Sequence, residues 1–195
     1  MEVIGKSGWV YVPNCYCTYR YLLGEKGRRP LICIGVNPST ATPSKLDRTL
    51  LQVQRTAMSS RENDGWMMLN LYPQRVTNPN DLDSVKNDRL MRRNYKIIAK
   101  VIKQVATVCD PVDIWCAWGG LIRKRTYLWV GAKQIFDLCS KYSVRWLRRG
   151  PLTKDGDPHH PLFVKREEEL KQFDMHGYLV NHAHIIEAAT NEIDF

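Results

Sequence analysis

Short apolar runs that alternate with segments of helical periodicity limit the fold of this chain more than any other feature of its sequence. The apolar runs cover residues 31–36, 66–69, 112–118 and, in a shorter form, 144–147. The helical periodicity covers residues 44–58, 87–105 and 126–140. Continuous apolar runs are typical of strands buried on both faces of a parallel sheet. The alternation predicts an α/β fold, a three-layer α/β/α sandwich with a mainly parallel central sheet.

The ends of these elements, and of the chain, carry further signals. Ser44 is the expected N-cap of the first helix. Residues 9–12 and 16–23 are rich in aromatic side chains and predict two short strands, interrupted by Pro13. A charged helix is expected from Lys165, and the weakly patterned end of the chain is typical of a tail or a docked arm.

The composition is that of an ordinary globular protein, with 44% hydrophobic and 25% charged residues in a chain of 195. This length suits a single domain, 1–195, with a core over about 18–164 and a C-terminal helix and tail over 165–195. No apolar run approaches the length of a membrane span, and the N-terminus lacks the apolar core of a signal peptide. We therefore expect a cytoplasmic protein without membrane contact.

The chain is basic, with a formal net charge of +9 at pH 7. Its Lys and Arg residues gather in four clusters, at 26–29, 89–93, 123–125 and 145–149. Such clusters suit a polyanionic partner, because each phosphate contact releases counterions. A solvated basic surface has the same composition, so the charge by itself favours nucleic acid only slightly.

The six cysteines form no recognisable metal-binding pattern. Cys15 and Cys17 are two residues apart. The others are scattered, mostly through apolar segments: Cys33, Cys109, Cys116 and Cys139. Because paired C-x-x-C motifs are missing, buried reduced thiols are the better interpretation, and we expect neither a metal nor a cofactor.

A polar turn, Gly35-Val36-Asn37-Pro38, follows the first apolar run and precedes the first helix. It contains no lysine, which distinguishes it from the phosphate-binding loop of ATP-binding proteins. Asn70, Gly119 and the loop that contains His160 also follow predicted strand ends. Because ligands bind at the carboxyl ends of parallel strands, we expect Asn37, Asn70 and His160 to line one cleft.

Seven short motifs resemble, in order and spacing, one known protein family. They read YRYLL, GVNPSTAT, LDRTL, NLYPQRVTNP, ND, AWGG and LTKDGDPHHPLF. Together they extend over about residues 18–164, and on them the chain is identified as a member of the family catalogued as domain of unknown function 1643. The name of that family indicates no biochemical activity.

A looser resemblance, to the uracil-DNA glycosylase superfamily, does imply chemistry and a fold. That superfamily has a G-x-N-P or G-x-D-P turn after its first core strand and an asparagine at a middle strand end. It also has a strand ending in W-G or L-G and a late H-P-S-P-L loop. Residues 35–38, 69–70, 117–119 and 160–162 look like these four elements in the same order. The late loop reads H-P-L-F and Asn37 replaces the aspartate of the uracil-specific branch, which points away from strict uracil specificity.

The resemblance implies three roles in the hydrolysis of an N-glycosidic bond. Asn37 would position the attacking water, because the reaction is dissociative and water needs positioning more than deprotonation. His160 would donate a hydrogen bond to the departing, negatively charged base. Asn70 has both a donor and an acceptor, as reading the Watson–Crick edge of a flipped base requires.

It also implies contacts with the rest of the nucleic acid. Leu162 or Phe163 would wedge into the base stack. Ser39, Thr40 and the N-terminus of the following helix would hold a backbone phosphate. The candidate substrate-binding set is completed by Gly35, Pro38, Tyr72, Arg75, Trp118, Gly119 and Pro161.

Several of these residues also have a purely structural interpretation. Asn37 suits any strand-to-helix turn, Asn70 could cap a strand, and Trp118 could belong to the core. Arg75 is either a phosphate contact or a surface charge. Asp47, after the turn, could be an N-cap, a partner that orients Asn37, or the catalytic base.

The leading hypothesis is a monofunctional DNA glycosylase that removes a damaged or modified base, with hypermodified phage bases as a narrower version. The four glycosylase-like motifs contain no lysine, which argues against a Schiff-base mechanism. A non-catalytic module that binds DNA or a modified base is the alternative. An enzyme of free nucleosides is a third hypothesis, against which the charge of +9 argues. We expect a monomer whose partner is DNA.

Overall fold

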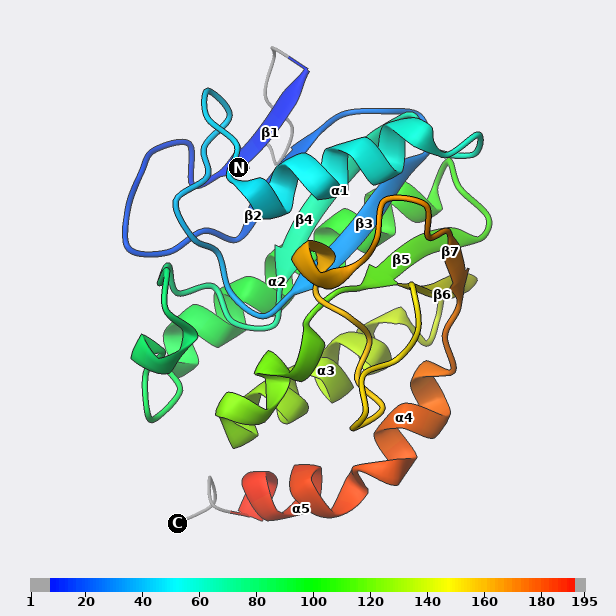
Figure 1. The fold of residues 1–195 in the computed structure, drawn as a ribbon. Helices are drawn as coiled ribbons and strands as arrows, with labels where there is room; N and C mark the ends of the chain where they lie inside the picture. The colour runs from blue at the N-terminus through cyan, green and yellow to red at the C-terminus, as the bar shows by residue number, and fades with distance from the viewer. Residues whose placement is uncertain (1–7, 192–195) are drawn as a thin grey trace.

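The computed structural model describes residues 8–191, which form a mixed α/β fold around a seven-stranded sheet (Figure 1). The strand order is β1-β2-β4-β3-β5-β6-β7. The strands are β1 (Trp9–Val12), β2 (Leu22–Glu25), β3 (Pro30–Gly35), β4 (Gly65–Asn70), β5 (Val112–Cys116), β6 (Val144–Arg149) and β7 (Leu170–Gln172). The helices are α1 (Arg48–Ser59), α2 (Asp88–Ala106), α3 (Thr126–Cys139), α4 (Met175–Asn181) and α5 (Ala183–Asn191). Short 3₁₀ helices are η1 (Pro79–Asp81), η2 (Gly119–Lys124) and η3 (Pro161–Phe163).

The three strongest apolar runs form neighbouring parallel strands in the middle of the sheet, as predicted. β3 pairs in parallel with β4 and with β5, and β6 continues the parallel part beside β5. Every residue of β3, β4 and β5 is buried, which explains the continuous apolar sequence.

The sheet as a whole is mixed, because β1, β2 and β7 pair antiparallel to their neighbours. An antiparallel neighbour needs no crossover helix, so these strands fall outside the alternation of apolar runs and helices that the sequence displays. The strand predicted at residues 16–23 is therefore misplaced, because the structure has β2 at Leu22–Glu25 instead.

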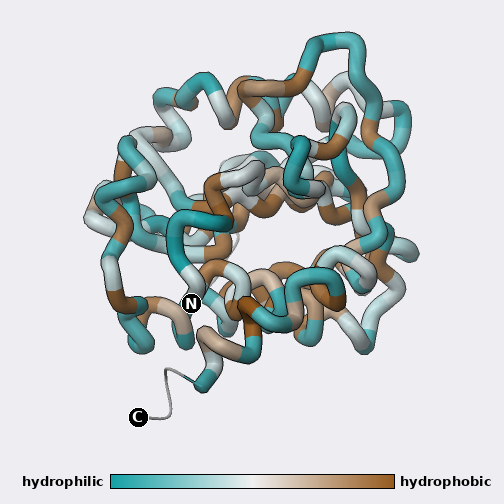
Figure 2. Tube along the Cα trace, turned by 60° about the horizontal axis from the view of Figure 1, so that its bottom comes forward, coloured by the Kyte–Doolittle hydropathy of each residue, from teal (hydrophilic) through white to brown (hydrophobic). Residues whose placement is uncertain are grey.

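Helices cover both faces of the sheet, and the alternation of side chains along each strand divides the core between them. In β3, Ile32 and Ile34 belong to the apolar cluster that includes residues of α2 and α3. Leu31 and Cys33 point the other way and belong to the cluster that includes residues of α1. Figure 2 shows hydrophobic segments mostly toward the middle of the molecule and hydrophilic segments mostly in its outer loops.

The predicted cap of the first helix is wrong by three residues. α1 begins at Arg48, and its N-cap is Asp47, whose Oδ1 accepts the amide of Leu50 at 2.9 Å. Ser44 instead lies in a tight turn closed by backbone hydrogen bonds between Thr42 and Lys45. A carboxylate at this position satisfies a free amide of the first turn as well as a serine does.

The helix predicted from Lys165 is also wrong. Residues 165–169 are five successive charged residues without an apolar face, and the chain next pairs with the edge of β6 as β7. α4 and α5 follow, and α5 lies against α3 (Figure 1). Within the described residues, no helix combines the length and apolarity needed to cross a membrane.

Candidate active site

A cavity of about 540 Å³ lies at the carboxyl ends of β3 and β4, beside the first turn of α1. Its walls come from the turn after β3, the start of α1, residues 76–79 and the loop that contains η3. The candidate residues that line it are Gly35, Asn37, Ser39, Thr40, Asp47, His160, Leu162 and Phe163. The structure therefore brings all three candidate catalytic residues to one cavity.

Asn37 is held with its side-chain oxygen free. Its Nδ2 donates to the carbonyl oxygens of Pro38 at 2.9 Å and of Val76 at 2.8 Å. Because a carbonyl oxygen can only accept, these contacts identify the amide nitrogen. Oδ1 then has no partner among the described residues, and an oriented free acceptor in the cavity wall can hold a water molecule.

His160 is an uncharged hydrogen-bond donor. Its Nδ1 accepts the amide of Leu162 at 3.4 Å, which assigns the proton of the neutral ring to Nε2. Burial lowers the pKa of His160 to about 4, and the nearby carboxylate of Asp47 opposes this shift only in part. At neutral pH the ring therefore presents Nε2–H without a positive charge.

Gly119 lets the His160 loop approach the end of β5. Its φ of +59° is in the left-handed region, and its N–H donates to the carbonyl of Pro158 at 2.9 Å. A Cβ at this position would lie 3.1 Å from both the Cβ and the backbone nitrogen of His160. Only glycine combines this backbone conformation with such close contact.

Arg20 is a buried cation in the wall of the same cavity. Its side chain is 1% exposed, and its Nη1 donates to the carbonyl of Ala41 at 3.2 Å. Burial and the neighbouring Arg75 lower its pKa to about 10, so it stays charged at neutral pH. Arg20 is not among the site residues that the sequence predicted, although it belongs to the YRYLL motif. Of the roles considered for Asp47, the structure shows that of N-cap.

Asn70, the last residue of β4, lies under the floor of the cavity with its amide unsatisfied. It is fully buried, and neither Nδ2 nor Oδ1 has a partner among the described residues. It pairs with Gly35, where an added Cβ would lie 3.2 Å from Asn70 Oδ1 and 2.6 Å from Met68 Cε. Met68 lines the cavity and Asn70 itself does not, so a ligand reaches the amide only if side chains of the cavity floor move.

Arg75 supports the turn at residues 39–41. Its guanidinium donates to the backbone carbonyls of Ser39 and, at 3.2 Å, Ala41, and to Tyr11 Oη at 2.7 Å. The side chain does not belong to the lining of the cavity. In this structure Arg75 therefore positions the turn.

Two candidate substrate contacts lie on the other side of the sheet. Tyr72 and Trp118 are 0% and 1% exposed and pack in the cluster that includes α2 and α3. Tyr72 Oη donates to Asp83 at 2.6 Å, and Trp118 Nε1 donates to Tyr178 Oη at 3.3 Å. Tyr72 and Trp118 follow strand ends in the sequence, but their rings do not reach the cavity.

The apolar residues of η3 lie at the edge of the cavity. Leu162 is 45% exposed and Phe163 is 75% exposed, whereas Pro161 is buried at the start of the helix. Neighbouring exposed apolar side chains at the edge of a cavity are typical of a surface that contacts a ligand.

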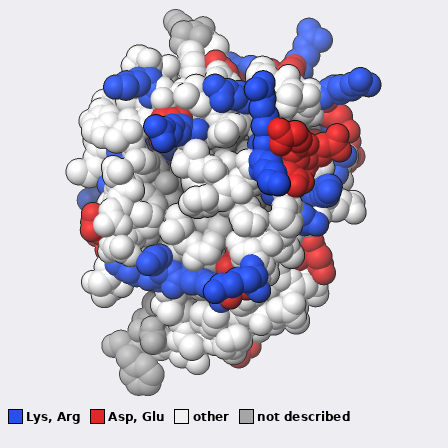
Figure 3. All heavy atoms as spheres, in the orientation of Figure 1, with Lys and Arg blue, Asp and Glu red and all other residues white. Residues whose placement is uncertain are grey.

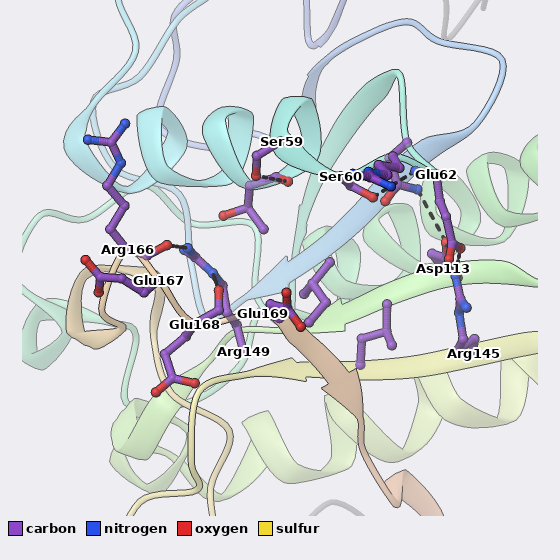
Figure 4. A pocket seen from close by; sticks show the side chains of 15 residues that line it. Ser59, Ser60, Glu62, Asp113, Arg145, Arg149, Arg166, Glu167, Glu168 and Glu169 are labelled. Carbon is purple, nitrogen blue, oxygen red and sulfur yellow. Dashed lines mark hydrogen bonds and ion pairs between the residues drawn. The ribbon is translucent and has the colours of Figure 1, made fainter.

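A second cavity, of about 500 Å³, lies between the end of α1 and the loop before β7 (Figure 4). Its most buried charge, Asp113, accepts from Arg145 Nε at 2.7 Å and Nη2 at 2.9 Å. Arg149 donates to the backbone carbonyls of Arg166 and Glu168. These groups satisfy one another, and Asp113 and Arg145 stand at the amino ends of β5 and β6. This cavity is therefore the weaker candidate for a site in a parallel sheet.

Basic side chains surround the middle of the face seen in Figure 1. Figure 3 shows Lys and Arg distributed around a largely uncharged centre, with an acidic group near one edge. Two arginines, Arg20 and Arg48, line the first cavity itself. This distribution of charge favours an anionic ligand.

The fold and the site define a mixed α/β protein with a cavity, lined by both polar and apolar side chains, at the carboxyl ends of its central parallel strands. The family described as "Protein of unknown function (DUF1643)" matches residues 20–162, most of the chain, and the protein belongs to that family. Comparison with curated proteins and with solved structures found no match.

Proposed function

We propose that the protein is a monofunctional DNA glycosylase, which hydrolyses the N-glycosidic bond of a damaged or modified base and leaves an abasic site. One observation carries this proposal: the free oxygen of Asn37 and the neutral His160 share a cavity above the unsatisfied amide of Asn70. The substrate class extends to hypermodified bases of phage DNA, with phage defence as the corresponding role.

Each group has a defined task in this reaction. The bond to the base breaks as the sugar becomes cation-like, and the base leaves with the bonding electron pair. His160 Nε2–H donates to the base as its negative charge develops. Asn37 Oδ1 holds the water that attacks the sugar carbon. Asp47, the only acid among the described lining residues, would take the proton that this water loses.

The resemblance to the uracil-DNA glycosylase superfamily supports the same proposal. Its four motifs correspond here to the turn after β3, the end of β4, the end of β5 and the start of η3. Helices on both faces of the sheet are compatible with the three-layer α/β/α sandwich of that superfamily, which we propose as the fold. The enzyme would act as a cytoplasmic monomer.

The charge and the apolar rim favour DNA over a free nucleoside as substrate. A small neutral ligand needs no wide basic surround, whereas a DNA backbone does. Leu162 and Phe163, exposed beside the cavity, would fill the gap that the flipped base leaves in the stack.

The test is single-turnover release of base by Asn37→Ala and His160→Ala, on DNAs that carry different modified bases. Loss of one transition-state hydrogen bond slows such reactions by about 10²- to 10³-fold, and we expect this of each variant. DNA binding, measured by titration, should stay nearly unchanged. His159→Ala, which removes the neighbouring imidazole outside the cavity, is the matched control and should cleave like the wild type.

Wild-type rates in both variants would contradict the assigned site. The alternative function, a module that binds DNA or a modified base without cleaving it, is favoured by one observation: Asn37 is an amide, which cannot accept a proton as a carboxylate can. Tight binding of a modified DNA without release of any base would support that alternative.

A further inference from the structure

The loop that carries His160 is anchored outside the cavity, through the fully buried carboxylate of Asp157. Arg123 Nε, from η2, donates to Asp157 Oδ2 at 2.8 Å. Tyr178 Oη, from α4, donates to Asp157 Oδ1 at 2.7 Å. Hydrogen bonds to a buried charged group are the strong ones, so these two contacts fix this part of the loop.

Tyr178 ties the loop to the core as well as to α4. Its hydroxyl accepts from Trp118 Nε1 at 3.3 Å, and its ring stacks on Trp129 with centroids 5.5 Å apart. Burial, together with the hydrogen bond to Asp157, raises the pKa of Tyr178, so the hydroxyl remains a donor at all ordinary pH values.

The anchor stands three residues before His160. Between them, the carbonyl of Pro158 accepts the amide of Gly119 at 2.9 Å, and the His160 backbone then packs directly over Gly119. The loop is thus attached at Asp157 and at Pro158, and the position of the imidazole depends on both attachments.

We propose that Asp157 and Tyr178 are positioning residues, through which α4 holds the His160 loop over the end of β5. The proposal rests on the proposed function for the role of His160 in the reaction. Asp157 and Arg123 lie within residues 20–162, the part that the family matches, whereas Tyr178 lies beyond it, so one of the two contacts to Asp157 comes from outside the matched part.

The test is Tyr178→Phe, which removes one hydroxyl and keeps the ring. The matched control is Tyr142→Phe, because the hydroxyl of Tyr142 bonds to no described residue. We expect the amides of residues 153–157 to exchange hydrogen about ten- to a hundredfold faster in Tyr178→Phe only, the range for a lost bond to a charged group. Arg123→Lys, which replaces the planar fork with a single ammonium, should act in the same direction.

Two further measurements separate positioning from general stability. In an NMR titration, the pKa of His160, which burial lowers to about 4 against the opposing effect of Asp47, should move toward its ordinary value in Tyr178→Phe. On a substrate that the wild type cleaves, base release should slow by about tenfold or more, with DNA affinity unchanged. Thermal unfolding of each variant verifies that it is folded.

Unchanged hydrogen exchange and an unchanged His160 pKa in a folded Tyr178→Phe protein would overturn the anchoring. Faster exchange with wild-type base release would overturn its importance for the reaction. A wild type that releases no base from any DNA would contradict the proposed function alone, because exchange and the His160 pKa still decide whether the anchor holds the loop.

Discussion

At the residue scale, Asn70 is a buried amide without a hydrogen-bond partner among the described residues. An unpaired buried polar group costs about 1–3 kcal/mol, so Asn70→Leu should raise the free energy of unfolding by about 1 kcal/mol or more. The same change should abolish base release, because the base then loses its donor and acceptor. Urea unfolding measures the first effect and the single-turnover assay the second.

Asn94→Leu is the control for that prediction. Asn94 is equally buried, and its Oδ1 also has no partner among the described residues, but its Nδ2 donates to the carbonyl of Asn70 at 2.9 Å. Its replacement removes that hydrogen bond and leaves a buried carbonyl unpaired, so it should lower stability. If Asn70→Leu were as destabilising as Asn94→Leu, the Asn70 amide would have to be satisfied in solution.

His160 predicts a particular pH dependence of stability. Its pKa is lowered from 6.5 to about 4, so the unfolded chain binds this proton more readily than the folded protein does. The contribution of His160 to the free energy of unfolding is therefore complete above pH 6.5. It is lost as the pH falls toward 4, and the loss amounts to at most about 3 kcal/mol. Urea unfolding between pH 4 and 7 should show this loss in the wild type and in His159→Gln, and lack it in His160→Gln. Parallel curves for all three proteins would contradict the assignment.

At the scale of elements, the junction of β5 and η2 depends on the first of two adjacent glycines. Gly119→Ala forces a side chain into a left-handed conformation and to within 3.1 Å of His160, which should cost about 1–2 kcal/mol. Base release should fall as well, since the His160 loop is pushed away. Gly120→Ala is the control, because its Cβ would meet only Asp157 Oδ2 at 3.8 Å. Equal stability and activity of the two variants would show that the junction tolerates a side chain.

At the scale of the whole molecule, the net charge of +9 predicts salt-sensitive DNA binding. If the protein contacts several phosphates, raising the salt from 50 to 200 mM should weaken its affinity for DNA by about 10³-fold. Fluorescence anisotropy measures this affinity. Arg48→Gln, at the cavity, should reduce the slope of the logarithmic plot by about one. Arg92→Gln, on α2 across the sheet, should leave it unchanged. Binding that is indifferent to salt would contradict a polyanionic partner.

The sequence by itself determined the parallel centre of the sheet and much of the site. β3, β4 and β5 could be predicted because strands buried on both faces are continuously apolar, and no surface residue interrupts the pattern. Asn37 and His160 could be assigned to one cavity because the carboxyl ends of parallel strands meet at one edge of the sheet.

Only the tertiary structure decided the rest, because the deciding contacts join segments that are distant in sequence. Trp118 stands at a strand end as Asn70 does, yet its side chain packs on the face of the sheet that α2 and α3 cover. Side chains alternate between the two faces only within a strand, so the sequence does not predict which face Trp118 takes after the strand has ended. Arg20 reaches the cavity from the segment before β2, which pairs with β4 more than forty residues later. The charged run at 165–169 is followed by strand β7, which pairs with the edge of β6. That edge exists only in the assembled sheet, so the local sequence could not predict the strand.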